Sequence, residues 1–302
     1  MLRSGTGRWE VRRLELDSEP MQRIALGDAE IAYSERGTGE PIVLVHAGVF
    51  GDWFLPVSAS PTLNDFRVIR VRRPGYGPTP PARHLTLGDH AHVVAALADR
   101  LALRRIHWVG HSSSCQMGLE LAIARPDLIQ TLILLEPAAL GGFTVPASEE
   151  LGRRFAGPAM EAFATGDVEA AFDTFMRGVC GDGHRAVTEG RLGPRAYERA
   201  LRDAAFFFRD ELPAVVESRF EVAEGARVQA PVLVVEGGES RRLGPLSHQI
   251  TALATTLLPH AEVVTLAGVN HQMPLQDPDA VGRVIAAFAR QHPISTHVGD
   301  ER

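Results

Sequence analysis

The stretch Ile106-His107-Trp108-Val109-Gly110-His111-Ser112-Ser113-Ser114 decides the fold of this chain. An apolar run ends at Gly110, a serine stands between small residues, and a helical run over residues 115–124 follows at once. This order predicts a strand, a sharp turn and a helix, the context in which Gly-x-Ser-x-small presents a nucleophilic serine. The flanking residues must be small because bulk there would collide with the strand and the helix. The alternative is that Ser112 is an ordinary helix N-cap.

Apolar runs on both sides of this stretch extend the pattern. Residues 132–135 form a second apolar run that closes on Glu136, and residues 87–103 have the apolar spacing of a helix. Strands that alternate with helices predict an α/β protein with a mostly parallel, doubly wound sheet. A final helix is expected over residues 279–292. The predicted strands are 23–26 and 29–33 as a hairpin, then 41–45, 66–71, 106–109, 132–135, 231–235 and 261–266.

Between about residues 139 and 228 the alternation stops and helical segments follow one another. We expect this insertion to form a helical cap over the carboxyl ends of the strands, where such sheets bind ligands. Residues 1–20 are expected to be an extension, and residues 21–138 with 229–302 to form the main domain. The expected cap helices are 147–155, 159–164, 168–179, 194–208 and 212–220. The cap holds Phe143, Phe155, Phe163, Phe172, Phe175, Phe206, Phe207, Phe208 and Phe220, which are nine of the 13 phenylalanines.

Composition narrows the class of protein. A chain of 302 residues that is 45% hydrophobic can bury the core of one sizeable domain. The net charge of −6 and the absence of a basic run argue against nucleic acid as a partner. Two cysteines give neither a disulfide framework nor a metal-ligand pattern. Since no apolar run of about 18 residues occurs, we expect no membrane insertion. We expect a cytoplasmic protein that is a monomer or a homodimer.

The order of motifs between residues 21 and 290 resembles the α/β-hydrolase superfamily. The matching pieces are His46-Ala47-Gly48, Arg73-Pro74-Gly75-Tyr76-Gly77, the turn at Ser112, a helical insertion, and Asn270-His271 after the last strand. This resemblance implies an α/β-hydrolase fold with Ser112 as nucleophile and His271 as general base. It implies no metal and no redox cofactor. The chemistry requires these types, because an imidazole must take the proton from a weakly acidic serine hydroxyl.

The acid of the triad is where the sequence departs from the commoner family pattern. Most members have an aspartate after the strand that follows the cap, whereas Ser240 stands there in this chain. Two carboxylates are candidates: Glu136, which closes the strand after the nucleophile helix, and Glu239, one residue short of the usual position. A charge that ends an apolar run is costly unless it is paired, and this favours Glu136.

Backbone N–H groups should form the oxyanion hole: that of Ser113, and that of Gly48 or Val49. The interpretation is an esterase-like or lactonase-like serine hydrolase that forms an acyl-enzyme on Ser112. A cofactor-independent lyase, cyclase or carbon–carbon hydrolase, and a binding protein without catalysis, are the alternatives. An apolar small-molecule substrate is expected from the Phe-rich cap and from three aromatic residues after the oxyanion loop, Phe50, Trp53 and Phe54.

Overall fold

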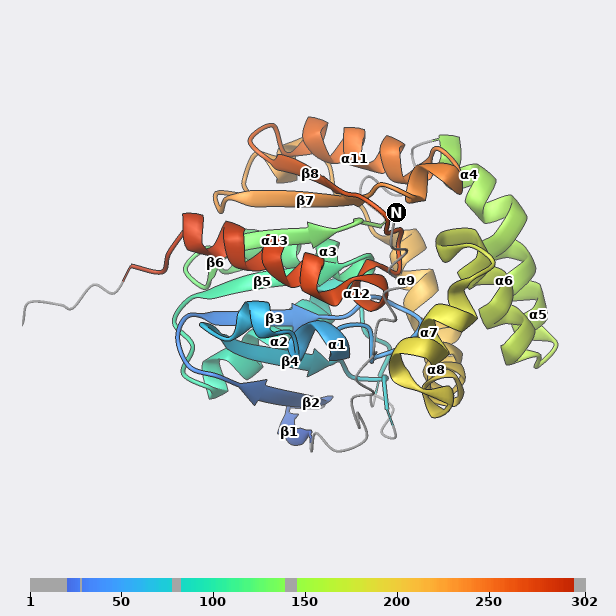
Figure 1. Cartoon of the computed structure of the whole chain (residues 1–302), viewed down its shortest axis with the longest axis horizontal. Coiled ribbons are helices and arrows are strands. Elements are labelled where there is room, and N and C mark those ends of the chain that lie inside the picture. Colours follow the sequence, from blue (N-terminus) through green and yellow to red (C-terminus); the bar gives the residue numbers. More distant parts are fainter. Residues whose placement is uncertain (1–20, 28, 78–82, 139–145, 296–302) are drawn as a thin grey trace, which may run out of the picture.

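The computed structural model describes residues 21–27, 29–77, 83–138 and 146–295 (Figure 1). In this part of the chain eight strands form one sheet in the order β1-β2-β4-β3-β5-β6-β7-β8. Strand β2 pairs antiparallel with both β1 and β4, and all other neighbours pair in parallel. The strands are β1 (Gln22–Leu26), β2 (Ala29–Arg36), β3 (Pro41–Val45), β4 (Arg67–Arg72), β5 (Ile106–His111), β6 (Ile129–Leu135), β7 (Val232–Gly237) and β8 (Glu262–Leu266).

Helices cover both faces of this sheet. Successive side chains of a strand point to opposite faces, so Trp108 packs in one apolar cluster and Val109 in the other. The first cluster includes buried residues of α2 (Leu87–Arg100), α3 (Ser113–Ala124) and α11 (Leu246–Leu257). The second includes those of α13 (Pro278–Gln291), which crosses the sheet in Figure 1. The predicted mostly parallel sheet between helices is therefore confirmed.

The described chain between β6 and β7 consists of helices joined by short loops and contains no strand among the described residues. Figure 1 shows the helices between residues 146 and 206 together beside the carboxyl ends of the parallel strands. Two π-helical segments, Gly152–Ala156 and Phe207–Glu211, interrupt them. The helices are α4 (Pro146–Leu151), α5 (Gly157–Ala164), α6 (Val168–Cys180), α7 (His184–Leu192), α8 (Pro194–Phe206), α9 (Leu212–Glu217) and α10 (Val222–Gly225). The division into residues 1–20, a main domain and a cap of 139–228 stays a prediction, and residues 1–20 and 139–145, with Phe143, lie outside the described residues.

Four helices were not predicted from the sequence. Helix α7 has few apolar side chains and therefore no clear apolar period, and its packing against α8 and α12 (Met273–Gln276) holds it in place. The other three, α1 (Leu55–Ser58), α10 and α12, have four residues each, too few for a period to show. Among the described residues no helix is both long and apolar enough to cross a membrane.

Helices of the insertion share an apolar core with the loop that follows β3. Phe172, Met176 and Phe208 lie in one cluster with Val49 and Trp53 of that loop. The insertion is therefore packed onto the loop that was predicted to supply the oxyanion hole.

Candidate active site

Ser112 lies on a strained turn between β5 and α3. Its φ of 57° and ψ of −119° are unusual for a residue with a side chain. Its side chain makes no capping hydrogen bond to any described residue, so the ordinary N-cap alternative does not hold. A Cβ at Gly110 would lie 2.6 Å from the Ser114 carbonyl oxygen, which explains the glycine. Ser114 Oγ fixes the turn, because it accepts from the His111 N–H (2.7 Å) and donates to the Val45 carbonyl (2.6 Å).

The carboxylate beside His271 is that of Glu136. Its Oε2 lies 2.8 Å from His271 Nδ1, while its Oε1 accepts from the Gly237 N–H (2.8 Å) and from the hydroxyl of Ser240. Burial alone would raise the pKa of Glu136, but His271, Ser240 and the Gly237 N–H outweigh it and lower that pKa below its ordinary value. Glu136 is therefore held as a carboxylate. Ser240, which stands at the position where the resemblance led us to expect the acid, donates to it instead.

The carboxylate of Glu239, the other candidate acid, contacts an arginine. Its carboxylate pairs with Arg242 at 2.6 Å and is one-third exposed. Among the described residues, the structure thus brings Glu136 rather than Glu239 to the imidazole. The roles of the two groups in a triad remain a prediction.

Ser112, His271 and Glu136 line one cavity of about 490 Å³. Three of the four described non-glycine residues with positive φ, Val49, Ser112 and Glu136, are in its wall, so backbone strain is concentrated there. The insertion supplies much of the apolar wall, with Leu151, Phe155, Phe175, Met176, Val179 and Phe207.

The expected aromatic wall needs a correction. Trp53 lines the cavity, but Phe50 and Phe54 are not among the lining residues. Phe50 stacks on Trp53 with ring centroids 4.3 Å apart, and Phe54 packs into the cluster beneath the sheet. The prediction failed for these two because a loop has no period that tells which side chains face the cavity.

The two loops that were expected to carry the oxyanion hole meet at this cavity. The N–H of Ser113 begins α3 and has no acceptor inside that helix. Opposite it, the Ala47 carbonyl lies 3.2 Å from Arg73 Nη2, and the Gly48 carbonyl accepts from Trp53 Nε1 at 2.8 Å. Because the C=O and N–H of a trans peptide point in opposite directions, these bonds also orient the N–H groups of Gly48 and Val49.

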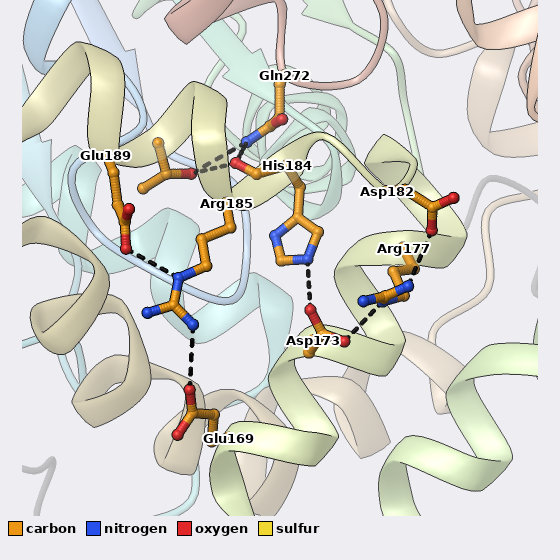
Figure 2. Close-up of polar contacts among 9 residues, drawn as sticks. Glu169, Asp173, Arg177, Asp182, His184, Arg185, Glu189 and Gln272 are labelled. Carbon is orange, nitrogen blue, oxygen red and sulfur yellow. Dashed lines mark hydrogen bonds and ion pairs between the residues drawn. The ribbon is translucent and has the colours of Figure 1, made fainter. Parts of the chain in front are cut away.

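Helices of the insertion hold the loop that carries His271. Asn270 donates from its side-chain amide to the Cys180 carbonyl at 2.7 Å. On the other side of His271, the Gln272 amide donates to the His184 carbonyl and to Thr188 Oγ1, each at 3.1 Å (Figure 2). The residues before and after the imidazole are thus both bonded to α6 or α7, so the insertion orients the histidine as well as enclosing the cavity.

A buried carboxylate of the insertion, that of Glu211, was not predicted from the sequence. Glu211 is 1% exposed and bonds to Arg73, Tyr76 and Ser113. A signal was present, because the charged residues Arg209 to Glu211 stand between two apolar runs, 206–208 and 212–215, and a charge that is buried in such a place needs a partner. Nothing in the sequence identifies that partner.

A second buried carboxylate of the insertion predicts a pH effect on stability. Asp203 accepts from the Gly51 N–H at 2.9 Å, and burial raises its pKa to about 6. Because this value lies above the ordinary one, the folded state binds the proton more tightly. Asp203 therefore contributes stability below about pH 4 that is lost as the pH rises through about 6.

Asp203→Asn should remove this dependence. Between pH 4.5 and pH 7, the free energy of unfolding of the variant is expected to gain about 2 kcal/mol relative to that of the wild type. Urea unfolding of both proteins at the two pH values measures the change. A difference that stays constant, or that moves in favour of the wild type, would contradict the expectation.

Comparisons with known proteins agree with this architecture. Residues 42–284 match the model of a family described as the alpha/beta hydrolase family. A dihydrolipoyllysine-residue acetyltransferase component of the acetoin cleaving system from Pseudomonas putida is 26% identical over 297 residues, which cover 90% of this chain and 70% of that protein.

Two solved structures are similar over most of the chain. The enol-lactonase from Burkholderia xenovorans LB400 is 19% identical with a TM-score of 0.70, and covers 89% of this chain and 100% of its own. A thermophilic esterase from Thermogutta terrifontis is 20% identical with a TM-score of 0.73, and covers 91% and 100%. At these identities the likeness shows a shared fold.

Proposed function

The chain belongs to the alpha/beta hydrolase family, and from this premise we propose that it is a serine hydrolase that cleaves an ester, a lactone or a related acyl bond of an apolar small molecule. One observation carries the proposal: Ser112, on its strained turn, lines the same cavity as an imidazole that contacts the buried carboxylate of Glu136. A pure binding protein has no need of a serine held in such a conformation.

In the proposed reaction Ser112 Oγ attacks the carbonyl carbon while His271 takes its proton. Since His271 Nδ1 faces Glu136, Nδ1 carries the hydrogen and Nε2 is the base. The oxyanion is stabilised by the N–H of Ser113 and that of Gly48 or Val49. His271 then protonates the leaving oxygen, an acyl-enzyme remains on Ser112, and a water molecule activated by the same imidazole releases the acid.

Two further observations support an acyl bond in an apolar substrate. The cavity wall contributed by the insertion is mostly aliphatic and aromatic, which favours burial of an apolar group. The names of the similar proteins, an acetyltransferase component, an enol-lactonase and an esterase, all point to chemistry at an acyl group.

The experiment combines active-site labelling with a substrate screen. Wild-type protein is incubated with a fluorophosphonate, the labelled peptide is identified by mass spectrometry, and p-nitrophenyl esters of increasing acyl length are assayed alongside small lactones. We expect the label on Ser112 and hydrolysis that improves as the acyl chain fills the cavity. A protein that neither reacts with the probe nor hydrolyses any of these substrates would refute the proposal, and would favour a lyase, cyclase or carbon–carbon hydrolase.

A further inference from the structure

One carboxylate of the insertion is bonded directly to one loop of the proposed oxyanion hole, at Ser113, and through Arg73 to the other, at Ala47. Glu211 ends the π-helical segment Phe207–Glu211, and such segments are frequent at functional sites. Its Oε1 accepts from Ser113 Oγ at 2.6 Å and from Arg73 Nη2 at 3.0 Å. Its Oε2 accepts from the hydroxyl of Tyr76. All four side chains are buried.

The group contains a buried ion pair between Arg73 and Glu211. Arg73 and Glu211 are both 0% exposed as side chains. Burial alone would raise the pKa of Glu211, but the Arg73 guanidinium beside it lowers that pKa below the ordinary value. A buried ion pair usually adds little to stability over an apolar pair of the same shape, because desolvation offsets the attraction. A gain in stability therefore explains the Arg73–Glu211 pair poorly, and a role in fixing the positions of the groups around it explains the pair better.

Arg73 links Glu211 to the loop after β3 by hydrogen bonds. The guanidinium reaches the Ala47 carbonyl, and the Arg73 backbone N–H donates to His46 Nε2 at 3.1 Å. His46 Nδ1 in turn lies 2.6 Å from the same Ala47 carbonyl. With its carbonyl held twice, the Ala47–Gly48 peptide cannot rotate, and the Gly48 N–H keeps one direction.

The π-helical segment Phe207–Glu211 also packs directly against Gly48. A Cβ at Gly48 would lie 2.5 Å from the ring of Phe207 and 3.3 Å from Glu211 Oε1. Only glycine permits this approach. Ser113, on the other side, is held through its side chain while its N–H stays available.

We propose that Glu211 is the positioning residue of the oxyanion hole, holding Ser113 directly and Gly48 through Arg73. This inference rests on the proposed serine hydrolase function. It makes the insertion a working part of the catalytic apparatus: the cap cannot swing away from the core without separating a buried charge pair and releasing both N–H groups.

The test is Glu211→Gln in the full chain. Removing an oxyanion donor costs about 10² to 10³ in kcat, and misplacing two donors should cost about 10- to 100-fold, with KM changed less than about threefold. The matched control is Glu169→Gln, the same change at another carboxylate of the insertion, which breaks the exposed ion pair between Glu169 and Arg185 (3.4 Å). The control should keep kcat within about twofold, since it touches neither loop.

A second measurement separates positioning from folding. Phenylboronic acid forms a tetrahedral adduct with an active-site serine, so its affinity should fall in Glu211→Gln by the same factor as kcat/KM. Ser113→Ala removes the bond to Glu211, leaves every charge in place and keeps the backbone N–H. It should lower kcat by about 3- to 10-fold, and the double variant should be no worse than Glu211→Gln alone.

The outcomes are distinct. If the wild type hydrolyses esters but Glu211→Gln and Ser113→Ala both retain full affinity for phenylboronic acid per labelled active site, the inference is overturned and the proposed function stands. If the wild type neither hydrolyses esters nor reacts with a fluorophosphonate, the proposed function itself fails.

Discussion

Ser112→Ala is expected to lower kcat on a p-nitrophenyl ester by about 10⁵- to 10⁶-fold, the loss seen when the nucleophile of a serine triad is removed. The reason is that alanine has no oxygen to form the acyl-enzyme, while the oxyanion groups and the cavity remain. Reaction with a fluorophosphonate should disappear as well. Steady-state kinetics and intact-protein mass spectrometry measure the two effects.

The fold should not change in this variant. Ser112 makes no side-chain capping bond to a described residue, so alanine loses no hydrogen bond there, and the midpoint of thermal unfolding should stay within about 2 °C. Ser218→Ala is the matched control, because that serine lies in the insertion outside the cavity wall and should leave kcat unchanged. Hydrolysis by Ser112→Ala within tenfold of the wild type would assign the nucleophile to another residue.

The turn at Ser112 could be predicted because its requirements are local. The turn needs a buried strand before it, a helix directly after it, and a glycine where a side chain would collide with Ser114. All three features lie within 20 residues. Most strands could be predicted for the same reason, since each is a short apolar run between turn residues. Local order therefore predicted the architecture.

Contacts between distant segments could not be predicted in this way. Glu211 meets Ser113 across 98 positions and Arg73 across 138, and nothing in the sequence around Glu211 names either partner. The choice of acid was open for the same reason. Whether Glu136 or Glu239 reaches His271 depends on how the loops after β6, β7 and β8 meet, which is a property of the folded sheet edge.

Glu136→Gln is expected to lower kcat by about 10³- to 10⁴-fold, as an amide does in place of a triad aspartate. An amide can donate to His271 Nδ1 and so favour the tautomer whose Nε2 carries the hydrogen and cannot accept the serine proton. It also removes the negative charge that stabilises the imidazolium. The matched control is Glu239→Gln, which loses only an ion pair with the exposed Arg242 and should keep kcat within about twofold.

A rescue experiment sharpens this test. The hydroxyl of Ser240 contacts Glu136 Oε1, so an aspartate at 240 would place a carboxylate beside the same imidazole, at the position that most family members use. Ser240→Asp in the Glu136→Gln background should therefore recover about 10- to 100-fold of the lost kcat, since a charge returns but its geometry is not optimised. If Glu239→Gln suffers the larger loss, and the aspartate at 240 restores nothing, the acid is Glu239 and the contact between Glu136 and His271 is structural. Recovery, in contrast, would show that the imidazole needs a nearby negative charge, which either of two strand ends can supply.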